Sequence, residues 1–229
     1  MSGLEAGLVV IQMSDWQFVF ENVDYLAGGL VLTIELTLAS IILGFVAGFP
    51  AGVIEVYGGK YSGGLIRFFG TVLRGTPLVV ILMFTFFVFS LGSAFTASLV
   101  GLGFRSGAYQ SQIFRGALQS VSEGQMEAAR AIGLTKLEAI YYVIVPQALR
   151  RSIPGFQNEF TIVLKDTSIA FAIGFAELLT RSNDLFVQQT TAVLEVILFV
   201  SAIYFVLTFG TNRGLDYLQN RFTIPTGED

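Results

Sequence analysis

Long apolar runs alternate with short polar stretches along the chain, and this pattern predicts several membrane-crossing helices. A helix needs about 20 apolar residues to cross the hydrocarbon core. We expect five such spans, at roughly 26–54, 72–91, 94–118, 154–179 and 189–209. The fourth is the least apolar, but residues 169–179 are apolar and an odd number of spans balances the charges. The pattern therefore predicts an all-α integral membrane protein, with residues 1–229 as a single transmembrane domain.

The composition agrees with this class and excludes several kinds of site. Hydrophobic residues make up 53% of the chain and charged residues 13%, against about 25% charged in soluble domains. Cysteine and histidine are both absent, which excludes disulfides and thiolate or imidazole metal ligands. No basic surface indicates binding of nucleic acid. No positive region precedes the first apolar run, so we expect no cleaved signal peptide.

The positions of the basic residues predict an orientation, because cytoplasmic loops are enriched in Lys and Arg. With the N-terminus outside, only Arg181 falls on the outer side, while Arg105 and Lys165 lie within spans. The ten on the inner side are Lys60, Arg67, Arg74, Arg115, Arg130, Lys136, Arg150, Arg151, Arg213 and Arg221. We therefore expect a plasma-membrane protein with its N-terminus outside and its C-terminus in the cytoplasm.

Three glycines, Gly44, Gly48 and Gly52, recur every fourth residue in the first predicted span. Such a stripe lets another helix backbone approach closely. Glycine is also simply frequent in membrane helices, so the sequence leaves both explanations open.

The longest predicted cytoplasmic segment, residues 115–152, has the pattern of a helix, a break and a second helix. Ser122–Gln125 and Thr135–Glu138 both fit a capping box, so each predicts a helix start. Gly133 precedes the second box, where a left-handed residue would end the first helix. We expect the second helix to run to Pro146.

The first of these helices is thin and has a charged edge. Ala128 and Ala129 are small, while Glu127 and Arg130 are charged. Such a helix suits a groove on a soluble partner; a solvated surface helix is the alternative.

The spacing of this segment resembles a family signature. Permease subunits of ATP-binding-cassette importers carry E-A-A, three residues, Gly, nine residues and I-x-L-P. Here Glu127-Ala128-Ala129, Gly133 and Val143-Ile144-Val145-Pro146 stand at matching positions, with valines replacing Ile and Leu. The resemblance implies that this is a coupling helix, whose Glu127, Ala128, Ala129, Arg130 and Gly133 dock in a cleft of an ATPase subunit.

Further motifs resemble the polar amino acid uptake branch, the histidine/glutamine permease type, over roughly residues 25–215. They are RGTP (74–77), AYQSQIFRGALQSV (108–121), GQMEAA (124–129), PQALRRSIP (146–154) and KDTS (165–168). The resemblance implies a type I importer bundle, a second identical or different permease subunit, an ATPase dimer and an extracytoplasmic amino-acid-binding protein. It implies no cofactor in this chain, with ATP and Mg bound by the ATPase. The family usually has an acid where this chain has Gln112.

Charged residues inside spans are costly, so they are candidates for a substrate site. Arg105, Tyr109 and Gln112 share one stripe of the third span. Glu159 and Asp166 share a face of the fourth, beside Asn158, Lys165, Thr167 and Ser168.

A zwitterionic amino acid needs an anion near its ammonium group and donors near its carboxylate. These side chains could supply both, and the resemblance supports positions around KDTS. The alternative is that the charges pair with one another to stabilise the bundle. Glu195 in the fifth span could pair with Arg105 or face a neighbouring subunit.

These features favour the membrane-spanning subunit of an ATP-driven amino acid importer over two rivals. The chain has no phosphate loop of its own, because Gly59-Lys60 is followed by Tyr61 and position 54 is Ile. A stand-alone secondary transporter or channel fits the intramembrane charge but gives the capped helix pair no role. An enzyme using Glu159 and Asp166 as paired carboxylates is disfavoured, since helix geometry separates them by about 10 Å.

Overall fold

The computed structural model describes residues 15–222, which form helices and no strands within that range. Residues 15–21 are helical and precede the longer elements. The α-helices are α2 (Val23–Tyr57), α3 (Lys60–Gly75), α4 (Leu78–Met83), α5 (Ala94–Gln119), α6 (Glu123–Ala131), α7 (Lys136–Ala139), α8 (Val145–Asp166), α9 (Leu178–Gln188) and α10 (Val193–Phe222). π-helical turns occupy Phe84–Val88 and Ile140–Ile144, and 3-10 turns occupy Thr167–Ile173 and Thr190–Ala192.

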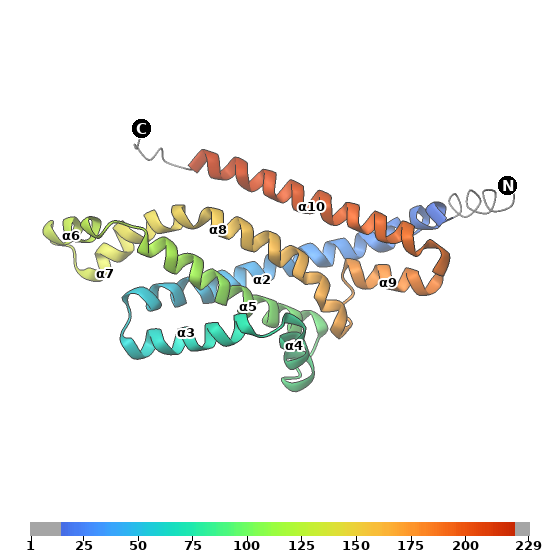
Figure 1. Ribbon diagram of the computed structural model, residues 1–229, viewed down its shortest axis with the longest axis horizontal. Helices are drawn as coiled ribbons and strands as arrows, with labels where there is room; N and C mark the ends of the chain where they lie inside the picture. Colours follow the sequence, from blue (N-terminus) through green and yellow to red (C-terminus); the bar gives the residue numbers. More distant parts are fainter. Residues whose placement is uncertain (1–14, 223–229) are drawn as a thin grey trace, which may run out of the picture.

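The long helices α2, α5, α8 and α10 run roughly along the long axis of the molecule (Figure 1). The short helices α6 and α7 lie at one end of this bundle, and α9 lies at the other (Figure 1). In the described chain α2 packs along α5, and α5 packs against α8. This arrangement makes α5 the central helix, with a neighbour on each side.

The glycine stripe of α2 is the surface on which α5 packs. Gly44, Gly48 and Gly52 are all buried. A Cβ added at Gly48 would lie 2.5 Å from the carbonyl oxygen of Gly107, and one at Gly44 would lie 3.1 Å from the amide nitrogen of Gly107. The stripe therefore serves close helix packing, the first of the two explanations that the sequence left open.

The segment expected as one helix at 72–91 is divided at the RGTP motif. There α3 ends at Gly75, α4 begins at Leu78, and the two helices are bent by 104°. Proline has no N–H to continue the helix and forces the preceding residue out of the α region. Thr76 accordingly has φ −90° and ψ 133°.

The segment expected at 154–179 is also divided. Its α-helix, α8, begins earlier, at Val145, and ends at Asp166, where a 3-10 turn follows. The hydroxyls of Thr167 and Ser168 donate to the carbonyls of Leu164 and Lys165, at 2.7 Å each. Such side-chain bonds compete with the regular helical ladder. Gly174, with φ 73°, then turns the chain towards α9.

The other three segments correspond to single helices, although their limits differ from the predicted ones. The first lies within α2, the third coincides with α5 to within one residue, and the fifth lies mostly in α10. Length and composition make α2 and the helical segment 190–217 able to cross a membrane, and the bent pair α3–α4 would be a third. Five spans remain a prediction.

Candidate functional site

The polar site predicted on α5 and α8 is centred on an ion pair between Arg105 and Asp166. Nη1 of Arg105 lies 2.6 Å from Oδ2 of Asp166, and the two side chains are 19% and 21% exposed. The Arg105 guanidinium also lies 5.1 Å from the ring centroid of Tyr109, which stands one turn further along α5. The structure thus brings together three of the predicted site residues, at a position that solvent reaches in part.

Glu159 lies on the same side of α8 but is enclosed. Its side chain is buried and accepts a hydrogen bond of 2.8 Å from Ser106, the residue next to Arg105. The two acids of α8 therefore face consecutive residues of α5, and only Asp166 is open to a ligand in this conformation.

The remaining predicted residues of α8 differ in exposure. Asn158 and Lys165 are exposed, Ser168 is half-buried and Thr167 is buried. The side chains of Asn158 and Lys165 have no hydrogen-bond or ion-pair partner among the residues that the structure describes. Lys165 precedes Asp166 in sequence, but its exposed side chain is not part of the Arg105–Asp166 ion pair.

Gln112 belongs to a different cluster from Arg105 and Tyr109. Its amide nitrogen donates to both carboxylate oxygens of Glu55 on α2, at 3.0 and 3.2 Å. The three-residue stripe predicted on α5 is therefore not one site, because α2 holds the Gln112 side chain. Glu195 does not pair with Arg105 either: the Arg105 guanidinium is held by Asp166, and Glu195 is buried on α10.

Arg74 is part of the site's surroundings, and the sequence assigned it no role. Its Nη1 donates to the carbonyl of Ala108 at 2.6 Å, and the Tyr109 hydroxyl donates to the carbonyl of Arg74 at 3.5 Å. These bonds fix the α3–α4 elbow against α5 beside Tyr109. In the sequence, the position of Arg74 directly before the helix-breaking Gly-Thr-Pro was the signal that could have indicated a role for it.

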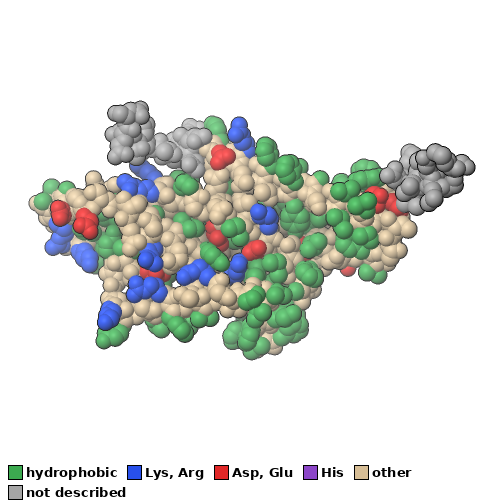
Figure 2. All heavy atoms as spheres, viewed as in Figure 1, with side chains coloured by type: hydrophobic (Ala, Val, Ile, Leu, Met, Phe, Trp, Pro, Cys, Tyr) green, Lys and Arg blue, Asp and Glu red, His purple; other side chains and the backbone are tan. Residues whose placement is uncertain are grey.

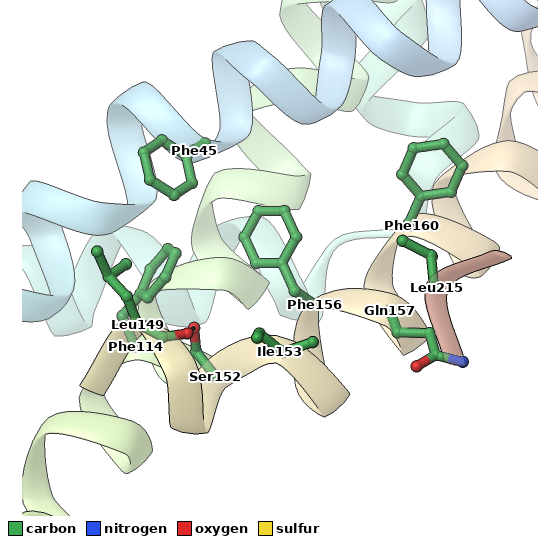
Figure 3. Close-up of a pocket in the computed structure, with 9 residues that line it drawn as sticks. All are labelled: Phe45, Phe114, Leu149, Ser152, Ile153, Phe156, Gln157, Phe160 and Leu215. Atoms are coloured by element: carbon green, nitrogen blue, oxygen red, sulfur yellow. Dashed lines mark hydrogen bonds between the residues drawn. The ribbon is translucent and has the colours of Figure 1, made fainter. Parts of the chain in front are cut away.

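An apolar cavity of about 210 Å³ lies between α2, α5, α8 and α10. Figure 3 shows Phe45, Phe114 and Phe156 among its lining residues, and their ring centroids are 5.4 to 5.8 Å apart. Its two polar lining residues are already hydrogen-bonded, Ser152 to the carbonyl of Leu149 and Gln157 to Asp216. The cavity thus offers little to a charged ligand, and the polar site is the cluster around Arg105.

The helix pair α6–α7 lies at the opposite end of the bundle from α9 (Figure 1). Glu127, Ala128 and Arg130 are exposed on α6, while Ala129 is buried against the rest of the chain. Gly133 has φ 96°, in the left-handed region that the sequence predicted. The amide of Leu134 closes the end of α6 on the carbonyl of Ala129, at 3.1 Å.

One of the two predicted capping boxes is confirmed. The Thr135 hydroxyl accepts from the amide of Glu138 at 3.3 Å, and the Glu138 carboxylate accepts from the amide of Thr135 at 2.7 Å. Bonds from the hydroxyl and the amide of Thr135 lower the pKa of the Glu138 carboxyl.

The prediction of a capping box at Ser122–Gln125 is wrong, since the Ser122 side chain makes no capping hydrogen bond. The Gln125 side chain instead accepts a bond from Gln147, at 3.2 Å. The predicted end at Pro146 is also wrong, because a π-helical turn leads from α7 into α8. Pro146 stands in the first turn of α8, where its missing N–H costs nothing.

Comparisons with known proteins agree with this architecture. Residues 40–224 match the family model described as "Binding-protein-dependent transport system inner membrane component". The glutamine transport system permease protein GlnP of Escherichia coli K12 is 35% identical over 216 residues, covering 92% of this chain and 98% of GlnP. The probable amino-acid permease protein YxeN of Bacillus subtilis is 31% identical over 85% of this chain and 89% of YxeN.

Solved structures give the same result. A chain of an amino acid ABC transporter crystallised with histidines has a TM-score of 0.80 and 32% identity, over 89% of this chain and 96% of that chain. An inward-facing MetNI methionine ABC transporter has a TM-score of 0.71 over 87% of this chain and 96% of that chain; at 20% identity it supports the fold alone. The type I importer bundle and the resemblance to permeases of the polar amino acid uptake type are confirmed. The chain belongs to the family of binding-protein-dependent transport system inner membrane components.

Proposed function

We propose that this chain imports polar amino acids as the membrane-spanning subunit of an ATP-driven transporter, and that the α6–α7 pair couples it to a separate ATPase. The observation that carries the proposal is the exposed surface of that pair. Ile132 and Leu137, on either side of Gly133, are 80% and 78% exposed. Large apolar side chains exposed beside the charged groups of Glu127 and Arg130 are typical of a protein-docking surface.

The substrate in this proposal is a zwitterion that binds at the Arg105–Asp166 pair. The ligand carboxylate would take the place of Asp166 at the guanidinium, and its ammonium group would take the place of Arg105 at the carboxylate. Partial exposure of both side chains supports this assignment. The names of the relatives, which specify glutamine, cystine or glutamate and aspartate, support the amino acid class.

The same proposal assigns an orientation and partners. Lys and Arg side chains visible in Figure 2 gather over the half of the molecule that carries α3, α6 and α7. The positive-inside rule then puts α6 and α7 in the cytoplasm, the C-terminus on the same side and the N-terminus outside. The partners are a second permease subunit, an ATPase dimer that binds ATP and Mg, and an extracytoplasmic amino-acid-binding protein.

Reconstitution tests the proposal directly. The chain is placed in proteoliposomes with the ATPase and binding protein encoded beside it, and amino acids are screened for stimulated ATP hydrolysis. We expect stimulation by a polar amino acid and its loss in Glu127→Ala, with Glu123→Ala as a control on the same exposed helix. Uptake by the chain alone, without ATPase or nucleotide, would instead indicate a secondary transporter or channel.

A further inference from the structure

Glu55 is a buried acid that the sequence did not single out. It lies at the C-terminal end of α2, where a charged side chain would ordinarily reach into solvent. Its side chain is instead 1% exposed. Burying a carboxylate is costly unless hydrogen bonds or an opposite charge compensate for the lost water. The surrounding side chains must therefore hold this group in place.

Gln112 and Arg115, both on α5, provide that compensation. The Gln112 amide nitrogen contacts both Glu55 oxygens, at 3.0 and 3.2 Å. The Gln112 amide oxygen in turn accepts from Nη1 of Arg115 at 3.1 Å, and the same nitrogen lies 3.9 Å from Glu55. The three side chains form one network, the Glu55 lock, which ties the end of α2 to α5.

The same end of α2 supports the α6–α7 pair. Val53, Val56 and Tyr57 pack against an apolar cluster that includes Val121 and Ile144, at the two ends of the segment containing α6 and α7. The Lys136 ammonium of α7 lies 6.0 Å from the Tyr57 ring centroid. In Figure 1 the C-terminal end of α2 lies at the same end of the molecule as α6 and α7. This cluster and the Lys136–Tyr57 contact give a displacement of the helix pair a route to the last turns of α2.

We propose that Glu55 is a positioning residue, whose lock with Gln112 and Arg115 passes movement of the α6–α7 pair through α2 to α5. Gln112 lies one turn from Tyr109 and two turns from Arg105 on α5, so the lock connects the docking surface to the helix that carries the polar site. The inference rests on the proposed function, because it concerns coupling between ATP hydrolysis and transport.

Exchanging the two functional groups tests the lock. Glu55→Ala removes the acceptor of Gln112 and the anion nearest to Arg115. Gln112→Glu puts a second carboxylate about 3 Å from the first, which like-charge repulsion disfavours. The double variant Glu55→Gln/Gln112→Glu restores one carboxylate, one amide and the bond between α2 and α5. Asp24→Ala is the matched control, because it removes an exposed carboxylate from the first turn of the same helix, outside the predicted span.

Two measurements on the assembled complex decide the outcome. The first is hydrogen exchange of backbone amides at 53–57 and 136–145, which we expect to increase in Glu55→Ala. The second is the number of amino acids imported per ATP hydrolysed. We expect this ratio to fall about fivefold or more in both single variants, because about fivefold is the lower limit of typical coupling between two sites. We expect the double variant to recover at least half of the loss and Asp24→Ala to match the unmodified chain.

The results separate this inference from the proposed function. If the unmodified complex shows no amino-acid-stimulated ATP hydrolysis, the proposed function fails, and the exchange measurement still decides whether the lock holds the end of α2. Unchanged exchange in Glu55→Ala overturns the lock. Increased exchange with an unchanged import ratio, or no recovery in the double variant, overturns the positioning role.

Discussion

Arg105 and Asp166 form an ion pair, 2.6 Å between Nη1 and Oδ2, that joins the middle of α5 to the last turn of α8. The pair stands where α8 gives way to a 3-10 turn, so its carboxylate lies at a break in regular structure. It can act as a brace between two helices, as a binding site, or as both. These roles predict different results when the two charges of the pair are exchanged by substitution.

Reversing the pair distinguishes a brace from a binding site. We expect Asp166→Asn to reduce uptake about tenfold or more, since a hydrogen bond to a charged group contributes about 1.5–3 kcal/mol. In the reversed variant, Arg105→Asp with Asp166→Arg, we expect thermal stability to recover while uptake does not, because the ligand charges then meet the wrong partners. Recovery of uptake would assign the pair to structure alone; Asp24→Asn, on an exposed first-turn acid of α2, is the control.

Gly48 should tolerate no side chain. Its added Cβ would lie 2.5 Å from the Gly107 carbonyl oxygen, so Gly48→Ala must separate α2 from α5. We expect a loss of about 1–3 kcal/mol in unfolding free energy, typical of overpacking. Gly116→Ala on α5 meets no atom within 4 Å and should be neutral or slightly stabilising. Denaturation of the purified chain in detergent measures both, and equal stability of the two variants would contradict the close packing.

Gly133 sets the break between α6 and α7 through its φ of 96°. An L side chain in the left-handed region costs about 1–2 kcal/mol, so Gly133→Ala should loosen the turn. We expect faster hydrogen exchange at Leu134 and weaker amino-acid stimulation of the ATPase. Gly133→Asn should have the smaller effect, because Asn adopts this region more readily than Ala. An identical effect of the two substitutions would show that the turn conformation is not what matters.

The capping box at the start of α7 should respond to acid. The Thr135 hydroxyl and amide bonds lower the pKa of Glu138 in the folded chain. The box therefore contributes its full stabilisation of α7 when the pH is above 4.5, the ordinary pKa of the carboxyl group. This contribution is lost as the pH falls through the lowered pKa, when the carboxyl takes up a proton. A carbon-13 NMR titration of Glu138, assigned by comparison with Glu138→Gln, should show a midpoint below the ordinary carboxyl value of 4.5. A midpoint at or above that value would contradict the box.

Local signals explain what the sequence predicted. Gly133 and the Thr135–Glu138 box act through neighbouring residues, so their spacing is sufficient to place the break in the α6–α7 pair. The glycine stripe likewise marks a packing surface, although only the structure identifies α5 as its partner. The apolar pattern predicted helices because burial in lipid and in the bundle imposes the same composition.

Other features depend on contacts between distant parts of the chain. Gln112 points to Glu55 rather than towards Tyr109 because an acid 57 positions earlier is buried beside it. The predicted capping box at Ser122 does not form, and the Gln125 side chain is bonded to Gln147 instead. The local signals that predict a helix start contain no information about this bond to a distant residue. The end of α8 at Asp166 carries no glycine or proline, so its sequence alone predicts continuation. Spacing fixes which residues share a helix face but not which neighbour that face meets.

The 104° elbow between α3 and α4 has a consequence for where water can reach. Hydrocarbon offers no hydrogen bonds to a peptide group, so non-helical backbone at membrane depth must lie against protein or line an aqueous space. One of the carbonyls at the end of α3, that of Arg74, is bonded by the Tyr109 hydroxyl. The other free groups of this corner must likewise meet protein or water, which makes the turn a marker for the interior of the protein rather than for its lipid boundary.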